Sequence, residues 1–162
     1  MSTSGRTSES KGRGTAQKLG FALFRTGLSV AKAYEAELAP LGLRHEHAGV
    51  LLTVGHDGPS HIRALARHLG ANRQTIVNAV DALEAAGAVE RVADATDARV
   101  TMVRLTRTGH GLLREVEAAS SRMDLRFAHV GTAADRAVVL KYLHAVEEAG
   151  ALEIRVGRAK EL

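Results

Sequence analysis

The chain has 162 residues, the length of about one domain, and its 22 Lys and Arg against 18 Asp and Glu give a formal net charge of +4. It contains no cysteine, which excludes disulfides, thiolate metal sites and thiol redox switches. No apolar run approaches the length of a membrane span, and the N-terminus lacks a signal-peptide core, so we expect a soluble, cytoplasmic protein that does not contact a membrane. The mild positive charge permits nucleic-acid binding without indicating it.

The N-terminal segment, residues 1–14, is dominated by Ser, Thr, Gly and single charges, and this composition predicts a disordered tail. Residues 16–38 then show a helical stripe of Leu, Ala and Tyr, and two phenylalanines add a second apolar side. A helix that is apolar on more than one side must contact more than one neighbour. Pro40 and Gly42 are expected to end this helix.

A second helix is predicted over residues 43–55, with His45 and His47 at its start. A metal site needs three ligands within reach, and the local spacing shows no such set, so we expect structural or solvent-facing histidines and no metal. Ser60 follows a Gly-Pro turn and is expected to cap the next helix, which begins at His61 or Ile62.

Residues 61–105 carry the strongest pattern in the chain. Two short apolar stripes at helical spacing are separated by Gly70, and the second ends at Gly87. The stripes consist of Ile62, Leu65, Ala66 and Leu69, followed by Ile76, Ala79, Val80 and Leu83. Two β-branched segments, 89–93 and 100–105, then flank a polar turn. A helix-turn-helix followed by a β-hairpin is a winged helix, in which the second helix lies in the major groove of DNA.

The recognition helix of this unit is predicted from about Asn72 to Ala86, with Gln74, Thr75 and Asn78 reading bases. Asn and Gln pair bidentately with adenine, so an A·T-rich half-site is expected. The full candidate set for DNA binding is Ser60, Asn72, Arg73, Gln74, Thr75, Asn78 and Arg99. The alternative is that these are ordinary polar surface residues.

Arg73 would hold a phosphate or a guanine from the start of the recognition helix. Arg99 would enter or span the minor groove from the wing, with Asp97 orienting it. An Asp97–Arg99 pair that merely fixes the hairpin is the alternative for the wing.

A long helix is predicted from Thr106 to about Val130, and Thr132 with Asp135 has the spacing of a capping box before a last helix that ends near Gly150. The apolar stripes of the terminal helices exceed what a small winged helix can cover. A two-fold dimer is the economical explanation, and packing of all these helices within a monomer is the alternative.

The predicted fold is therefore mainly α with a small β-hairpin: a winged helix-turn-helix with N- and C-terminal dimerisation helices. We assign residues 43–106 to the DNA-binding domain, and 15–42 with 107–156 to the dimerisation region. Within that region, residues 16–38 and 125–156 are expected to form the dimer interface.

Several segments, in order and at matching spacing, resemble the MarR family of winged-helix transcriptional regulators. They are Leu41–Leu43 with Val50–Leu52, Leu65–Gly70, Val80–Val89, Asp94–Arg99 and Leu105–Gly109. The resemblance implies a homodimer that binds a short palindromic operator in double-stranded DNA and is released by a small ligand or an oxidant. Ala98 departs from it, because the wing signature has a further arginine there, and Gly20 stands where the peroxide-sensing branch has its reactive cysteine.

The resemblance also places an effector pocket between the first helix, the start of the second and the long helix after the hairpin. The candidate ligand-binding residues are Phe21, Phe24, Arg25, His45 and His47. Phenylalanine rings beside an arginine suit a small aromatic carboxylate, although core phenylalanines beside a surface arginine are the alternative.

No catalytic residues and no cofactor are expected. The sequence has no nucleophile–base pair, phosphate loop or paired carboxylates in an apolar setting, so an enzyme is not expected. The leading prediction is a ligand-responsive repressor, and the alternative is a winged helix that binds a protein partner without specific DNA binding.

Overall fold

The computed structural model describes residues 18–94, 96–97 and 99–159, and their side chains up to residue 149. The predicted tail, residues 1–14, lies outside this part. The elements are α2 (Leu19–Leu38), the 3-10 helix η1 (Ala39–Leu41), α3 (His45–Asp57), α4 (Ile62–His68), α5 (Arg73–Ala85), β1 (Val89–Ala93), β2 (Thr101–Leu105), α6 (Arg107–Phe127) and α7 (Ala133–Ala159). The predicted fold class, mainly helical with one small hairpin, is confirmed.

The chain divides into two compact units, one running to Met123 and the other beginning at Asp124. Helix α6 crosses this boundary. A search of the described helices finds none with the length and apolar character needed to span a bilayer.

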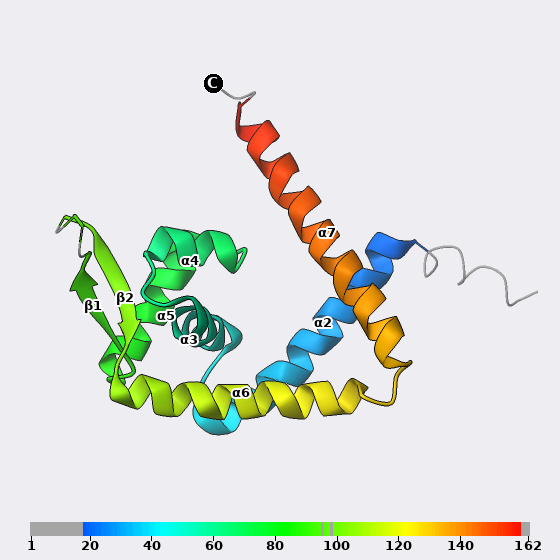
Figure 1. The fold of residues 1–162 in the computed structure, drawn as a ribbon, viewed down its shortest axis with the longest axis horizontal. Helices are drawn as coiled ribbons and strands as arrows, with labels where there is room; N and C mark the ends of the chain where they lie inside the picture. The colour runs from blue at the N-terminus through cyan, green and yellow to red at the C-terminus, as the bar shows by residue number, and fades with distance from the viewer. Residues whose placement is uncertain (1–17, 95, 98, 160–162) are drawn as a thin grey trace, which may run out of the picture. The chain divides into compact units, whose positions relative to one another are not determined.

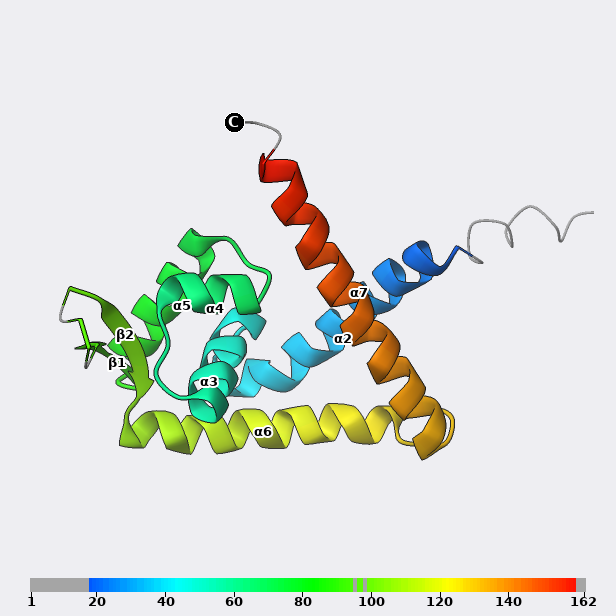
Figure 2. The same cartoon turned by 45° about the horizontal axis from the view of Figure 1, so that its top comes forward.

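The winged helix forms the centre of the first unit. Helices α3, α4 and α5 pack together beside the N-terminal half of α6, and the antiparallel hairpin of β1 and β2 extends from them (Figures 1 and 2). Both predicted apolar stripes face inward: Leu65 and Ala66 of α4 are buried, and Ile62 and Leu69 pack against the core. The stripe of α5 is buried throughout, at Ile76, Ala79, Val80 and Leu83.

The start of α6 lies directly against the start of the hairpin. The backbone N–H of Thr106 donates to the carbonyl of Ala88 at 3.0 Å, and the Thr106 hydroxyl accepts from the N–H of Gly109 at 3.1 Å. A Cβ on Gly109 would lie 1.9 Å from the Ala88 carbonyl oxygen, so only glycine fits this approach. The winged helix therefore continues into α6 through a fixed junction.

Several predicted boundaries need correction. The helix expected over 43–55 spans His45–Asp57, and α7 continues to Ala159 instead of ending near Gly150. Ala151, Leu152 and Glu153 are strong helix formers, which outweigh one glycine without a following proline. The expected capping box is confirmed: Thr132 N–H donates to Asp135 Oδ2 at 2.7 Å, and Asp135 N–H donates to Thr132 Oγ1 at 3.2 Å.

The prediction that Ser60 caps α4 is wrong. The residue at the N-cap position is His61, and its side chain makes no capping hydrogen bond. Ser60 instead forms an isolated antiparallel β-bridge with Val103 of β2. Its backbone N–H donates to the Val103 carbonyl at 3.0 Å, and its carbonyl accepts the Val103 N–H at 2.9 Å. Its hydroxyl donates to the Gly58 carbonyl at 3.1 Å.

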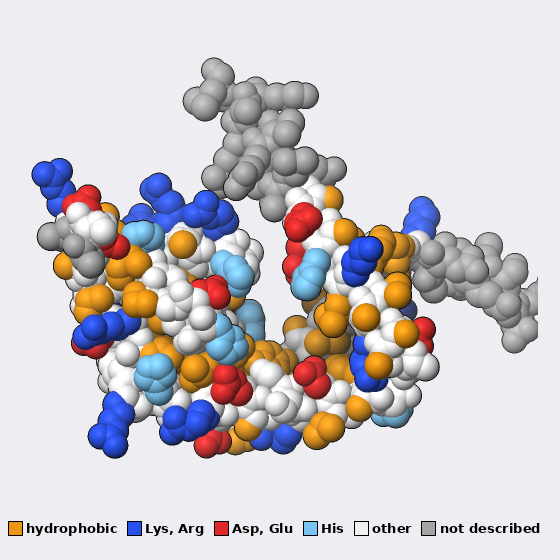
Figure 3. Space-filling view, in the orientation of Figure 1, with side chains coloured by type: hydrophobic (Ala, Val, Ile, Leu, Met, Phe, Trp, Pro, Cys, Tyr) orange, Lys and Arg blue, Asp and Glu red, His pale blue; other side chains and the backbone are white. Residues whose placement is uncertain are grey.

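Helices α2 and α7 expose large apolar side chains. On α2, the C-terminal end is covered, with Leu38 buried and Tyr34 hydrogen-bonded to Ser120 at 3.0 Å, whereas Phe24 and Leu28 are 61% and 56% exposed. In the second unit, hydrophobic side chains gather along α7 (Figure 3). The exposed ones include Val138, Val139, Leu140, Tyr142 and Val146. Each helix thus keeps a large exposed part of its predicted apolar stripe.

Candidate nucleic-acid interface

Helix α5 is positioned by a cap at its start and by its buried face. Asn72 has an extended backbone, and its Oδ1 accepts the backbone N–H of Thr75 at 2.8 Å, as an N-cap residue does. Because the apolar face is buried, the polar face must point outward. Arg73, Gln74 and Asn78 are exposed there, and Thr75 is half-buried. The structure therefore places Asn72, Arg73, Gln74 and Asn78 on the exposed side of α5, with Thr75 half-buried beside them.

Two of these side chains are already paired. Gln74 Nε2 donates to Asn78 Oδ1 at 2.8 Å, an i, i+4 contact along the helix. The pair keeps Gln74 Oε1 as an acceptor and the N–H groups of Asn78 Nδ2 as donors for a further partner. Adenine offers the complementary set in the major groove, a donor at N6 and an acceptor at N7.

The wing turn is held by carboxylates that accept from the backbone. Asp94 Oδ1 accepts the N–H of Thr96 at 2.7 Å and that of Asp97 at 3.2 Å, and the hydrogen bond from the Thr96 hydroxyl is the main reason why the pKa of Asp94 is lowered. Asp97 Oδ1 accepts the backbone N–H of Arg99 at 3.0 Å. Asp97 thus orients the backbone at Arg99, whose side chain is exposed.

An arginine that the sequence analysis did not single out ties the wing to α5. Arg91 on β1 forms ion pairs with Asp81, at 2.5 Å, and with Glu84, both on α5. The hydrogen bond to Asp81 is the largest cause of the raised pKa of Arg91. The sequence does show two acids three residues apart on α5, Asp81 and Glu84. It could not show that Arg91 is their partner, because that contact depends on the tertiary fold. These two ion pairs, together called the Arg91 clamp, connect β1 to α5.

Cationic side chains surround this surface. In Figure 3, Lys and Arg side chains gather over the exposed side of α4 and at the end of the hairpin. Arg63, Arg67, Arg73 and Arg99 are exposed, and the ion pairs found among the described residues do not include them. Arginines without carboxylate partners are available for phosphates, whose neutralisation supplies much of the affinity of DNA-binding proteins.

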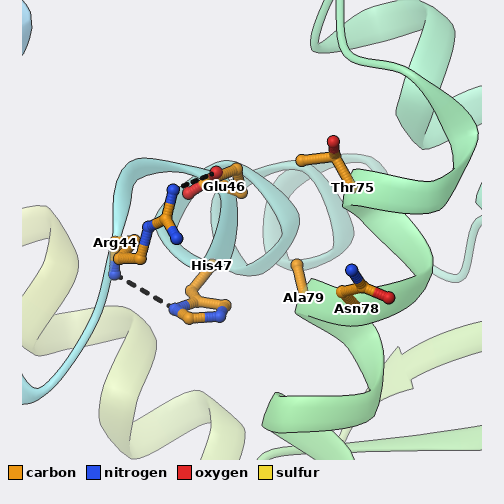
Figure 4. A pocket seen from close by; sticks show the side chains of 6 residues that line it. All are labelled: Arg44, Glu46, His47, Thr75, Asn78 and Ala79. Atoms are coloured by element: carbon orange, nitrogen blue, oxygen red, sulfur yellow. Dashed lines mark hydrogen bonds and ion pairs between the residues drawn. The ribbon is translucent and has the colours of Figure 1, made fainter.

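Two cavities lie between the start of α3 and helix α5. One, of about 230 Å³, is lined by Arg44, Glu46, His47, Thr75, Asn78 and Ala79. Figure 4 shows the α3 side chains of this set facing those of α5. The other, of about 370 Å³, is lined by His45, Glu46, Leu69, Gly70, Ala71, Asn72, Thr75 and Ile76. A molecule in either cavity would contact the helix that carries the predicted base-reading residues.

The start of α3 supplies the charged and imidazole groups of these cavities. Arg44 donates to Glu46 Oε1 at 2.9 Å through its guanidinium and to His47 Nδ1 at 3.0 Å through its backbone N–H (Figure 4). Burial lowers the pKa of His47, which favours the neutral ring that accepts this hydrogen bond.

The predicted ligand residues fall into two groups within one chain. His45 and His47 line the cavities, whereas Phe21, Phe24 and Arg25 are exposed near the other end of α2. Arg25 precedes Glu35, which contacts His45, by ten residues, or about 15 Å along the helix. Within the chain, the two groups therefore lie apart along α2.

Comparison with known proteins supports the assignment of the fold. A family model described as MarR family matches residues 41–100. The HTH-type transcriptional repressor Rv2887 of Mycobacterium tuberculosis is 32% identical over 108 residues, which cover 67% of this chain and 78% of that protein. The family-model match runs from the end of η1 through β1, and the alignment with the repressor is longer than this match.

Two solved structures extend the likeness to most of the chain. CouR of Rhodococcus jostii RHA1, bound to p-coumaroyl-CoA, is 26% identical with a TM-score of 0.77, covering 83% of this chain and 95% of that one. The M. tuberculosis MarR family protein Rv2887 in complex with salicylic acid is 29% identical with a TM-score of 0.65, covering 79% and 95%. On this evidence the chain belongs to the MarR family of winged-helix, DNA-binding transcriptional regulators.

Proposed function

We propose that this regulator is a homodimeric repressor that binds a short palindromic operator and is released by a small aromatic acid. The observation that carries the DNA-binding part is the outer face of α5, where Arg73, Gln74 and Asn78 are exposed opposite a fully buried apolar face. A helix held in this way can enter the major groove without disturbing the core. Such a protein would work in the cytoplasm, with the DNA.

Each recognition residue has a proposed role. Gln74 and Asn78 read adenine as a pair, with Thr75 beside them. Asn72 and Arg73, at the N-terminus of α5, bind phosphate, where the helix dipole favours an anion. The remaining contacts are made from the hairpin, by Arg99 in the minor groove and by Ser60 at the backbone.

The proposed dimer covers the apolar surfaces of the terminal helices. Phe24 and Leu28 of α2 and the apolar row of α7 are exposed in the single chain, and monomeric proteins rarely leave such large apolar side chains in contiguous patches. A two-fold dimer through residues 16–38 and 125–156 buries them and matches the symmetry of a palindromic site. The dimerisation region and the DNA-binding domain would then be 15–42 with 107–156, and 43–106.

The proposed effector is an aromatic carboxylate. Related regulators have been solved with salicylic acid and with p-coumaroyl-CoA. In this chain, the cavity beside α5 offers the Arg44 guanidinium and the His47 ring for a carboxylate. In the dimer, Phe21, Phe24 and Arg25 would wall a site together with His45 and His47 of the other chain. A ligand releases DNA only if it binds the DNA-free arrangement more tightly.

DNA binding can be tested with a labelled fragment from the region upstream of the protein's own gene, titrated at two salt concentrations beside a shuffled fragment of equal length. A specific regulator binds the genuine fragment more tightly, and its affinity falls steeply with salt. Equal, weak binding of both fragments would contradict the proposal. It would favour a winged helix that binds a protein partner.

The effector can be tested by adding a panel of aromatic acids to the protein–DNA complex and repeating the assay with Arg25→Ala and Arg44→Ala. Release by an acid in the parent, and loss of release in a variant, identifies the arginine that holds the carboxylate. If no acid releases the DNA, or both variants respond like the parent, the effector assignment fails while DNA binding stands.

A further inference from the structure

Three side chains of metal-ligating type meet where α2 turns into α3. Glu35 lies near the end of α2, and His45 and Glu46 are the first two residues of α3. One ligand atom from each of the three lies within 4.8 Å of the others. The sequence analysis considered the histidines alone, because a partner from an earlier helix cannot be recognised by spacing.

The connection between the helices brings these side chains together. Helix α2 ends in η1, and Gly42, with φ 67°, turns the chain back in a conformation that glycine adopts without strain. The backbone N–H of His45 then donates to Glu35 Oε1 at 3.3 Å. The same carboxylate oxygen contacts His45 Nδ1, and this side-chain hydrogen bond is the main cause of the lowered pKa of Glu35.

The cluster has more acceptors than its protons can satisfy. An imidazole Nδ1 carries at most one proton, and the Glu35 carboxylate occupies it. Glu46 Oε2 lies 3.6 Å from the same nitrogen, is buried, and has no hydrogen-bond partner. The other oxygen of Glu46 accepts from Arg44 at 2.9 Å. A buried carboxylate oxygen without a partner is costly, so this position calls for a cation.

We propose that Glu35, His45 and Glu46 bind a divalent transition-metal ion, with zinc the best match. The ion would take the place of the Nδ1 proton, which moves to Nε2 as the neutral ring changes tautomer, and would accept lone pairs from all three side chains. One nitrogen and two carboxylate oxygens are ligands that zinc accepts, with water in the fourth position. The two carboxylates balance the charge of the ion.

The geometry requires only small side-chain adjustments. Ligand atoms around a tetrahedral zinc ion lie about 3.4 Å apart, given bonds of about 2.0–2.2 Å. Glu35 and His45 have the exposed side chains, 38% and 57%, and can rotate toward the more buried Glu46. His47 is excluded as a ligand through Nδ1, because that atom accepts the N–H of Arg44.

The site would join the end of α2 to the start of α3. Its ligand Glu46 also lines both cavities that face α5. An ion that binds the folded state alone stabilises it by mass action, so zinc should raise the melting temperature. This inference concerns the isolated protein and does not depend on DNA binding.

The chain offers a matched control for this site. His56 Nε2 pairs with Glu117 at 2.9 Å, and the group of three ligand-type residues found within the described structure does not include this pair. Glu46→Gln and His45→Gln remove a ligand from the proposed site, whereas His56→Gln removes an equally exposed histidine elsewhere. Glu46→Gln keeps an oxygen that can accept from Arg44 and removes the buried carboxylate oxygen that has no hydrogen-bond partner, so the metal-free variant should stay folded.

The experiment uses the full chain, freed of metal by dialysis against a chelator. Zn²⁺ is titrated by calorimetry, Co²⁺ by its visible absorption, and melting is measured with and without zinc. We expect one ion per chain, a zinc-dependent rise in melting temperature, and loss of both in His45→Gln and Glu46→Gln but not in His56→Gln. No ion binding, unchanged binding in the two site variants, or equal loss in His56→Gln would overturn the site.

Discussion

The winged helix and the terminal helices have similar apolar patterns but very different burial. In α5, all four residues of the predicted stripe are buried, and Leu51 of α3 and Leu65 of α4 are fully inaccessible. In the N-terminal half of α2 and along α7, residues at comparable spacing, such as Leu28 and Val139, are more than half exposed. The winged helix buries its apolar side chains within the chain, whereas the terminal helices leave many of theirs exposed.

The difference shows that an apolar stripe predicts burial without saying which molecule provides it. The winged helix can bury its own apolar side chains because its short helices are joined by tight turns and pack against the hairpin and α6. A long helix with an exposed apolar row is stabilised by a partner instead. We therefore expect the winged helix to govern folding and DNA contact, and the terminal helices to govern assembly.

The largest expected effect is on the self-contained core. Leu65→Ala should lower the free energy of unfolding by about 2–5 kcal/mol, because it leaves a cavity among fully buried side chains. Chemical denaturation at two protein concentrations measures it. Leu140→Ala, on the exposed row of α7, serves as the comparison, and the loss it causes should depend on protein concentration if α7 lies in a dimer interface. If both variants lost the same free energy of unfolding at both protein concentrations, the distinction between the two regions would be wrong.

The next effect concerns assembly. Phe24→Asp with Leu28→Asp should convert a dimer into a folded monomer, because both exposed apolar side chains would place charges in the proposed interface. Sedimentation should change from about twice the chain mass of 17.2 kDa to that mass, with the circular dichroism of the winged helix kept. Lys32→Glu, also exposed on α2, controls for added negative charge. A dimer that survives the double substitution would place the interface elsewhere.

These comparisons also show what could be predicted from the residues alone. The winged helix could be predicted because its signals are local. The apolar stripes of period 3.6 correspond to α4 and α5, and the β-branched segments around a polar turn correspond to the hairpin. The cap by Ser60 was wrong because the residue is taken up by pairing with Val103, a contact far away in sequence. The cap that Asn72 provides for α5 was not predicted, and it leaves the proposed DNA contact of this residue untested.

Contacts between distant elements could not be predicted. The clamp of Arg91 on Asp81 and Glu84 and the meeting of Glu35 with His45 depend on how the helices are stacked. A residue type indicates its chemistry, but only the fold determines which groups share a site.

DNA recognition should be more sensitive than stability to changes on the outer face of α5. Gln74→Ala and Asn78→Ala should each weaken operator binding by about 1–3 kcal/mol if they read a base, with little change in melting temperature. The two effects should be less than additive, because the side chains are hydrogen-bonded to each other. Fluorescence anisotropy measures the affinity, and Glu115→Ala, exposed on α6, is a matched control. Unchanged affinity in both variants would refute the assignment.

The smallest expected effect is at the wing. Arg99→Ala should reduce the slope of log affinity against log salt by about 0.9 if the charge of Arg99 in the minor groove neutralises one phosphate, while the melting temperature is unchanged. The structure favours this outcome, since Asp97 holds the backbone N–H of Arg99 and not the guanidinium. A marked fall in melting temperature would instead indicate that Arg99 stabilises the hairpin.

The most direct test of the whole account is the mass of the protein–DNA complex formed on the fragment upstream of the gene. Native mass spectrometry or sedimentation of the labelled duplex reports how many chains bind each site. The account predicts two chains per duplex, twice 17.2 kDa of protein, at all ratios of protein to DNA. A complex with a single chain, formed as tightly and as specifically, would contradict it.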